Sequence, residues 1–261
     1  MLNRVLKMFR NGDSGAAPDG PMVPPVALQE FVGGDYERVG EEFRSYLVEL
    51  AELQPHQAIL DVGCGSGRIA VPLTRFLDAA GRYQGFDVSH AAIDWCKRHI
   101  GRRFPNFEFR VADIQNGPYN PKGKYQPSEF RFPYPDGTFD VVLLASVFTH
   151  MFPADVEQYM REIQRVLKPA GRCLGTFFLL NVESLALIAE KKGKLNFEHV
   201  RDGYRTIDAQ RPEEGMAYPE AFVIDAWKKA GMEFRAPIRY GSWCGRPQYV
   251  SFQDVVIATK A

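Results

Sequence analysis

The sequence has few cysteines, and their arrangement argues against a metal centre or a disulfide framework. The 261 residues contain four of them, with neither a C-x-x-C pair nor a cluster of histidine and cysteine ligands. They are Cys64, Cys96, Cys173 and Cys244. Such isolated cysteines favour reduced thiols, and we therefore expect a cytoplasmic protein.

Long apolar runs and an excess of one charge are also missing. No continuous stretch reaches the roughly 18 apolar residues that span a bilayer, so stable membrane insertion is not expected. The opening MLNRVLKMFRNG is basic but lacks the apolar core of a signal peptide; we expect a frayed end, with a short amphipathic helix as the alternative. Because 32 basic residues balance 32 acidic ones, the composition gives no support for nucleic acid as a partner.

Beyond a lead-in rich in glycine and proline, helical and extended patterns alternate along the chain. We expect residues 1–30 to be flexible and residues 31–261 to form a single domain. The periodicity predicts helices at 36–53, 68–77, 91–99, 156–167 and 220–230, and strands at 58–62, 83–87, 107–112, 139–145, 172–180, 233–239 and 254–259. This alternation predicts an α/β fold, a Rossmann-like seven-stranded and mostly parallel sheet with helices on both faces. The last connection is too short for a crossover helix, so the last strand should be antiparallel.

The stretch ILDVGCGSGRIA, residues 59–70, joins the first predicted strand to a helix through three glycines. Gly63, Gly65 and Gly67 leave a turn whose bare backbone another protein segment, a phosphate or a different ligand can approach closely. The dinucleotide-binding fingerprint requires a small residue where Arg68 stands, which argues against a nicotinamide enzyme.

This glycine turn resembles motif I of the class I S-adenosylmethionine-dependent methyltransferases. The similarity continues in GFDVS, where Asp87 matches the acidic residue that binds the ribose, and in RVADIQ, where Asp113 and Ile114 match the adenine contacts. It covers roughly residues 58–180. The resemblance implies S-adenosylmethionine as cofactor, bound by Asp61, Gly63, Cys64, Gly65, Gly67, Asp87, Val88, Asp113, Ile114, Ala145 and Ser146.

His150 follows the fourth strand in ASVFTHM and is the candidate general base, since imidazole titrates near neutral pH. The alternative is a structural histidine. The N/D-P-P-Y/F/W segment of family members that methylate adenine or protein amides is absent, so we expect a hydroxyl acceptor. The resemblance to saccharide-pathway enzymes favours a sugar or glycan intermediate, with lipid, quinone or natural-product acceptors, or a catalytically silent cofactor-binding protein, as alternatives.

Two insertions outside the resemblance, residues 116–137 and 181–219, are expected to shape the acceptor pocket. Tyr240, Trp243 and Arg246 are candidate acceptor-binding residues, or else plug the end of the sheet. Mg²⁺ is possible, because a metal can lower the pKa of a hydroxyl, but no spacing identifies its ligands.

The segment from Phe31 to Phe43 is expected to fold over the cofactor about a hinge at Gly33 and Gly34. The alternative is a helix that packs only on the flank of the sheet. The sequence leaves open whether the protein is a monomer or a homodimer.

Overall fold

A computed structural model describes residues 22–261 of the chain, which divide into two compact units with their boundary between Ala112 and Asp113. The predicted frayed end and most of the predicted lead-in lie outside the described residues. The expectation of a single domain stays a prediction.

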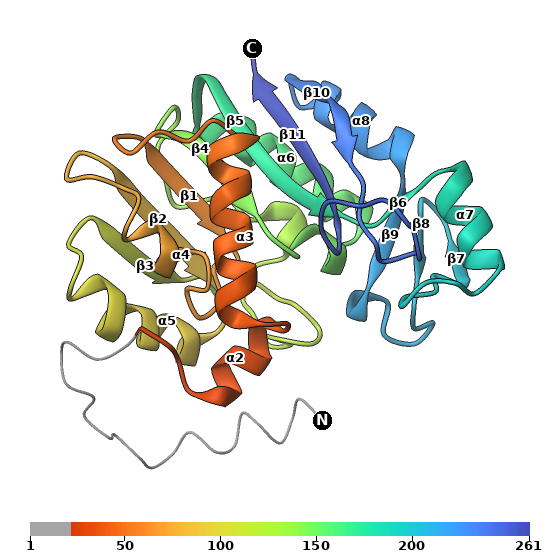
Figure 1. Cartoon of the computed structure of the whole chain (residues 1–261), viewed down its shortest axis with the longest axis horizontal. Helices are drawn as coiled ribbons and strands as arrows, with labels where there is room; N and C mark the ends of the chain where they lie inside the picture. Colours follow the sequence, from red (N-terminus) through yellow and green to blue (C-terminus); the bar gives the residue numbers. More distant parts are fainter. Residues whose placement is uncertain (1–21) are drawn as a thin grey trace. The chain divides into compact units, whose positions relative to one another are not determined.

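The first unit is built on three parallel strands. The strands β1 (Ala58–Val62), β2 (Arg82–Asp87) and β3 (Phe107–Val111) pair in this order, and all five residues of β1 are buried. Helix α3 (Tyr36–Glu49) packs against the short α4 (Ala70–Leu73), and α5 (His90–Cys96) packs against β2 and β3 (Figure 1). The carboxyl ends of β1 and β2 carry the glycine turn and Asp87.

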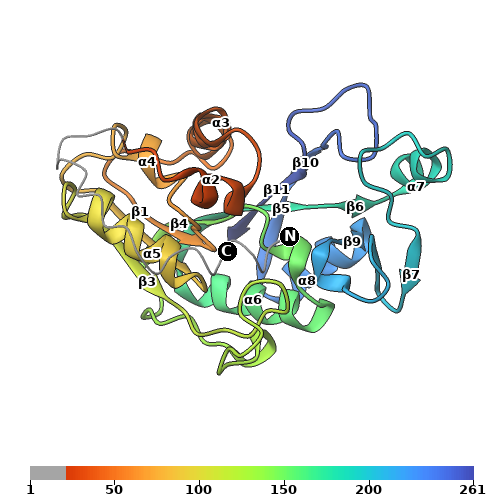
Figure 2. The same ribbon diagram turned by 90° about the horizontal axis from the view of Figure 1, so that it is seen from below.

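The second unit contains the other strands of the main sheet. The strands β4 (Phe139–Leu144) and β5 (Leu167–Phe177) are parallel, and β11 (Asp254–Lys260) runs antiparallel to both β5 and β10 (Met232–Arg239). Helices α6 (Pro153–Val166) and α8 (Glu220–Lys229) lie side by side (Figure 2). The sheet has seven strands in the order β10-β11-β5-β4-β1-β2-β3. The predicted Rossmann-like, mostly parallel sheet with an antiparallel last strand is therefore confirmed.

Two helices differ from the sequence expectation. Helix α2 (Val26–Val32) begins within the predicted lead-in, where Leu28 is buried. The helix expected over residues 68–77 is regular only from Ala70 to Leu73 and continues as hydrogen-bonded turns. Pro72 has no amide hydrogen to donate to the carbonyl of Arg68, which favours a start later than the predicted residue 68.

The second insertion adds three strands to β6 (Leu179–Leu180) and so forms a small second sheet. The strands β6, β9 (Met216–Pro219), β8 (Tyr204–Thr206) and β7 (His199–Arg201) pair in this order. Helix α7 (Val182–Ala189) lies beside them (Figures 1 and 2). Their shared apolar core contains Phe178, Phe197 and Trp243. Among the described helices, none is long and apolar enough to cross a bilayer.

Candidate functional site

The glycine turn that follows β1 requires glycine for conformational reasons. Gly63, Gly65 and Gly67 have φ angles of 74°, 54° and 78°, in the left-handed region that other residues adopt at a cost. The amides of Gly63 and Cys64 both donate to the carbonyl of Phe86, at 2.8 and 3.1 Å. The turn is therefore bonded to the end of β2.

Asp87, at the carboxyl end of β2, organises the turn through both carboxylate oxygens. One oxygen accepts the amide of Gly65 at 2.9 Å, and the other accepts the amide of Ser89 at 2.8 Å. Burial raises the pKa of the Asp87 carboxyl, and the amides of Ser89, Gly65 and Val88 lower it. A carboxylate oxygen can accept more than one hydrogen bond, so these contacts are compatible with ribose hydroxyls as further donors.

Asp61, the acidic residue within β1, is 1% exposed and accepts the hydroxyl of Tyr83 at 2.6 Å. Burial raises the pKa of the Asp61 carboxyl to about 7, the Tyr83 hydrogen bond lowers it, and the charge of Asp87 raises it further. Asp61 thus titrates close to neutral pH from within the strand.

Helix α2 packs directly on the glycine turn. A Cβ atom added at Gly65 would lie 2.5 Å from a methyl carbon of Val32, so the bare backbone of the turn admits this segment of the protein. The hydroxyl of Ser66 donates to the carbonyl of Leu28 at 3.0 Å. The hydroxyl of Tyr36 donates to the carbonyl of Ser66 at 2.8 Å, which joins the start of α3 to the same turn. The location agrees with the expected cap, whose closure over cofactor stays a prediction.

Arg68 holds the carboxyl end of α2. Its guanidinium donates to the carbonyl of Val32 at 3.0 Å and to that of Gly33. Gly33 and Gly34 follow with φ angles of 68° and 67°, which gives the expected hinge its conformational basis. Arg68, which breaks the dinucleotide-binding fingerprint, therefore holds the end of helix α2 at the glycine turn.

The four cysteines are buried free thiols. The thiols of Cys64 and Cys96 both lie against the carbonyl of Gly65, at 3.9 and 3.6 Å. Within residues 22–261, no group of three or more His, Cys, Asp and Glu side chains is placed to hold a metal ion. The structure therefore offers no ligand set for the possible Mg²⁺ in that range.

Asp113 and Ile114, the predicted adenine contacts, lie at the base of the first insertion. The side-chain amide of Asn120 donates to the carboxylate of Asp113 at 3.2 Å and to the carbonyl of Ile114 at 3.0 Å. The amide of Tyr125 donates to the carbonyl of Asp113 at 3.0 Å. These bonds fold residues 116–125 back on Asp113 and Ile114.

Ala145 and Ser146 follow β4, and the backbone of Ser146 is strained. Its φ angle is 61°, which is rare for a residue with a side chain and is found most often at functional sites. The amide of Ser146 donates to the hydroxyl of Thr176 at 2.8 Å, and its hydroxyl donates to Gln253 at 3.2 Å. These contacts stabilise the strained conformation.

His150 ends a 3-10 turn, Phe148–His150, and is half-buried. Its Nδ1 lies 2.7 Å from the carbonyl oxygen of Glu213, and the ring of Tyr119 stands edge-on at 5.9 Å between centroids. Burial lowers the pKa of His150, while the Glu213 carbonyl and the charges of Glu214 and Glu213 raise it. The net shift is downward, so the imidazole is neutral at neutral pH.

Glu213 also joins the two insertions to each other. Its carboxylate accepts the amide of Gly117 at 3.1 Å, and a Cβ atom at Gly117 would lie 2.3 Å from that carboxylate. Glu213 belongs to the second insertion and Gly117 to the first. Both insertions therefore meet at the histidine predicted to be the base.

The carboxylate of Asp254, at the start of β11, collects four donors. It accepts the indole N–H of Trp243 at 2.8 Å, the guanidinium of Arg246 at 3.0 Å, and the amides of Leu179 and Gly241, both at 2.7 Å. Burial raises the pKa of Asp254 to about 6, and these donors lower it.

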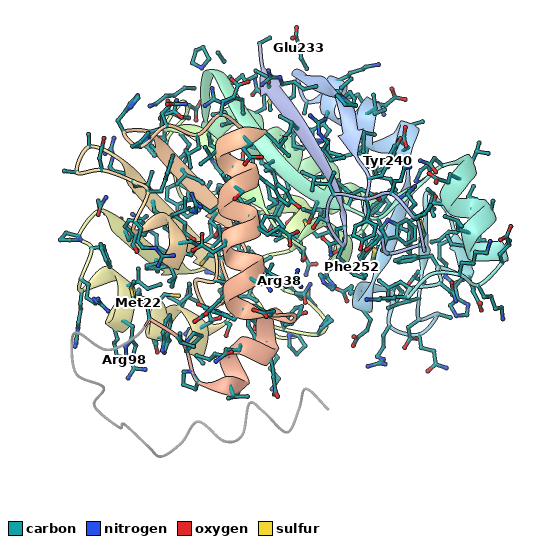
Figure 3. The ribbon with its side chains drawn as sticks, viewed as in Figure 1. Met22, Arg38, Arg98, Glu233, Tyr240 and Phe252 are labelled. Atoms are coloured by element: carbon teal, nitrogen blue, oxygen red, sulfur yellow. The ribbon has the colours of Figure 1, made fainter. Side chains whose placement is uncertain are left out.

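The candidate acceptor-binding residues differ in how accessible they are. Trp243 is fully buried and Arg246 is 3% exposed. Their burial agrees with the alternative that these two residues pack at the end of the sheet and do not bind an acceptor. Tyr240, labelled in Figure 3, is half-buried; its hydroxyl donates to Glu220 at 2.9 Å and its ring lies 4.5 Å from the Arg246 guanidinium. The assignment of these residues to acceptor binding stays a prediction.

Sequence reasoning missed Glu213, Thr176 and Gln253. Glu213 is 63 positions from His150, and Gln253 is 107 positions from Ser146 and 77 from Thr176. None belongs to a motif, so their sequence context gave no signal.

A Rossmann-like sheet with a glycine turn after its first strand and an acidic residue after its second defines the fold class of the class I methyltransferases. Residues 60–175 match the family model described as a methyltransferase domain. Over these residues the chain is therefore similar to methyltransferase domains.

Curated relatives and a solved structure are similar to this chain over more than half of its length. Methyltransferase GfsG of Streptomyces halstedii is 30% identical over 65% of this chain and 52% of its own length. A demethylmenaquinone methyltransferase of Symbiobacterium thermophilum is 32% identical over 55% of this chain and 50% of its own length. The chain spans about half the length of these curated relatives. A solved protein of Pyrococcus horikoshii OT3 is 18% identical with a TM-score of 0.60, covering 90% of this chain and 95% of that one, which shows a common fold.

Asp87 and Gly65 are predicted to bind S-adenosylmethionine, and two substitutions test this prediction. Asp87→Ala should weaken binding of S-adenosylhomocysteine by roughly 2–4 kcal/mol, because it removes charge-assisted hydrogen bonds to the ribose. Gly65→Val should also weaken it, because valine disfavours φ 54° and collides with Val32. Calorimetric titration measures both, with Asp94→Ala on α5 as control. Unchanged affinity in both variants would remove the glycine turn from the cofactor site.

Asp61 predicts a pH dependence of stability. Between about pH 4, where an unfolded aspartate titrates, and about pH 7, the folded state retains a proton that the unfolded state has lost. The free energy of unfolding should therefore fall as the pH rises through this window, by on the order of 2–4 kcal/mol relative to Asp61→Asn. Urea unfolding at several pH values measures the difference, and Asp94→Asn is the control. Parallel pH profiles for wild type and Asp61→Asn would contradict the assignment.

The cap over the glycine turn predicts protection from proteolysis. Cleavage near Gly33 and Gly34 should slow when S-adenosylhomocysteine is added, because ligand and α2 contact the same turn. Arg68→Ala should increase cleavage without ligand, whereas Arg38→Ala, on the exposed side of α3, should not. Limited proteolysis followed by mass spectrometry measures this, and no protection at saturating ligand would refute the cap.

Proposed function

We propose that this protein transfers a methyl group from S-adenosylmethionine to a hydroxyl of a small molecule, with a sugar or glycan intermediate as the favoured acceptor. The observation that carries the proposal is the hydrogen bond between His150 Nδ1 and the carbonyl oxygen of Glu213, at 2.7 Å. The proposed enzyme is a cytoplasmic monomer or homodimer, and it does not act on nucleic acid.

The Glu213 carbonyl decides which nitrogen of His150 carries the proton. A carbonyl oxygen only accepts hydrogen bonds, so Nδ1 is the protonated nitrogen and Nε2 has a lone pair. Burial keeps the imidazole neutral by lowering the His150 pKa. A neutral imidazole with a fixed tautomer is what a general base requires.

S-adenosylmethionine, when bound, supplies a methyl group on a positively charged sulfur. Asp87 and the glycine turn would hold the cofactor, and His150 Nε2 would take the hydroxyl proton. The acceptor oxygen would form its bond to the methyl carbon as the bond from that carbon to sulfur breaks, which leaves S-adenosylhomocysteine. Holding the reacting atoms in line supplies much of the acceleration, because it avoids the entropy loss of a bimolecular encounter. A neutral sugar hydroxyl is a poor nucleophile, so removal of its proton supplies the rest.

An aromatic or quinol acceptor is the second candidate. It is favoured by three exposed apolar side chains before β11: Tyr249, 60% exposed, Val250, 46%, and Phe252, 40%. A flat aromatic ring would bury these side chains more completely than a sugar would. Incubation with S-adenosylmethionine and a panel of methyl glycosides, catechol and a naphthoquinol, with S-adenosylhomocysteine as the readout, separates the two. Cofactor binding without turnover on any of them would support the silent alternative.

His150→Ala should lower kcat on a hydroxyl acceptor by roughly 10²–10⁴-fold and leave S-adenosylhomocysteine affinity unchanged, because it removes the base alone. The wild-type rate should rise with pH through a pKa below the ordinary histidine value and level off near neutral pH. Stopped-time assays across pH measure both, with the exposed His199 changed to alanine as control. A full kcat in His150→Ala would show that alignment alone is the mechanism.

A further inference from the structure

Three polar side chains, each in or next to the end of a different strand, form hydrogen bonds to one another beside the end of β4. Ser146 follows β4, Thr176 lies near the end of β5, and Gln253 immediately precedes β11. The hydroxyls of Thr176 and Ser146 both donate to the side-chain oxygen of Gln253, at 2.5 and 3.2 Å. Phe252, labelled in Figure 3, is the exposed neighbour of Gln253 in the loop between β10 and β11.

We propose that Gln253 binds the methyl acceptor, donating its side-chain N–H groups to an acceptor oxygen, and that Thr176 and Ser146 orient it. The inference rests on the proposed function and names a specificity-determining residue for it. The chemical class of ligand is an oxygen-bearing small molecule, in which a hydroxyl, ring or carbonyl oxygen accepts the hydrogen bond.

The hydrogen bonds fix which end of the amide is available. The Thr176 hydroxyl accepts the amide of Ser146 at 2.8 Å, so its own hydrogen is directed to Gln253. With the side-chain oxygen engaged by two hydroxyls, the NH₂ group points away from them. Within the described part of the chain, no residue accepts a hydrogen bond from that NH₂ group, so both donors of the half-buried Gln253 are available to a ligand.

The backbone on both sides of Gln253 is fixed. The carbonyl of Phe252 accepts the amide of Trp243 at 3.1 Å, and Asp254 holds four donors, including the buried guanidinium of Arg246. A donor held in this way loses little conformational entropy on binding, which is the requirement for a specificity contact.

The position suits an acceptor contact. In open α/β sheets, ligands bind outside the carboxyl ends of the parallel strands, and Ser146 and Thr176 lie at those ends of β4 and β5. The strained φ of Ser146 indicates a conformation kept for its geometry rather than for stability. The exposed Tyr249 and Phe252 add apolar surface beside the amide.

Gln253→Glu provides the central test, because glutamate keeps the shape and still accepts both hydroxyls but has no N–H to donate. Its kcat/KM for the panel member that wild type methylates best should fall by about 10- to 100-fold, mainly through KM. Affinity for S-adenosylhomocysteine should stay within about twofold of wild type. Gln164→Glu on α6 makes the same chemical change at another half-buried glutamine and should alter neither quantity.

The orienting role of Thr176 needs a separate readout. Thr176→Val should raise KM for the same acceptor, because it removes the hydroxyl that holds Gln253, and Thr176→Ser should restore it. A merely structural role would instead lower the melting temperature and the S-adenosylhomocysteine affinity together. Gln253→Met fills a similar space without N–H groups or charge, and it should raise the KM as Gln253→Glu does. That result would show that the added negative charge of glutamate does not cause the effect.

The outcomes separate this inference from the proposed function. If wild type methylates a panel member and Gln253→Glu and Gln253→Met keep its kcat/KM, the inference fails and the proposed function stands. If wild type methylates none of the panel while binding S-adenosylhomocysteine, the proposed function fails and the inference with it. An increase in the KM for the acceptor that is confined to the Gln253 and Thr176→Val variants supports the inference.

Discussion

The carboxylate of Asp254 is the interaction on which most of the second unit depends. It lies fully buried at the amino end of β11 and binds donors from β6, from the loop after β10 and from the side chains of Trp243 and Arg246. A buried guanidinium without its carboxylate is strongly destabilising, and so is the reverse. Because the small sheet begins at β6, this one group connects the main sheet of the second unit to the insertion.

In the first unit, a buried carboxylate likewise holds the glycine turn. Asp87, at the end of β2, accepts backbone amides from the turn and from the residue that caps α5, as Asp254 accepts backbone amides at the start of β11. In both cases burial raises the pKa of the carboxyl while the donors lower it. A carboxylate that collects several amides fixes a loop more rigidly than any single hydrogen bond, because each donor constrains the same group.

The two insertions, residues 116–137 and 181–219, meet at His150. The glycine turn and Asp87 lie among the residues that are similar to methyltransferase domains. Gly117 lies in the first insertion and Glu213 in the second, and Glu213 contacts both Gly117 and His150. A fold shared by enzymes with many acceptors leaves specificity to such segments. The second insertion holds the imidazole through the carbonyl of Glu213, and the 3-10 turn that follows β4 positions it.

The positions of the main strands along the chain, the glycine turn and the antiparallel direction of β11 could all be predicted from the sequence. These follow from local properties: apolar runs for buried strands, left-handed glycines for the turn, and a connection too short for a crossover. Only the tertiary structure decided that α2 covers the turn, that Arg68 fastens it, that Trp243 is buried, and that Glu213 and Gln253 lie beside His150 and Ser146 respectively. The physical reason is that local patterns reflect the conformation of neighbouring residues. Hydrogen bonds between residues as far apart as 107 positions depend on how the strands are ordered, which no local pattern encodes.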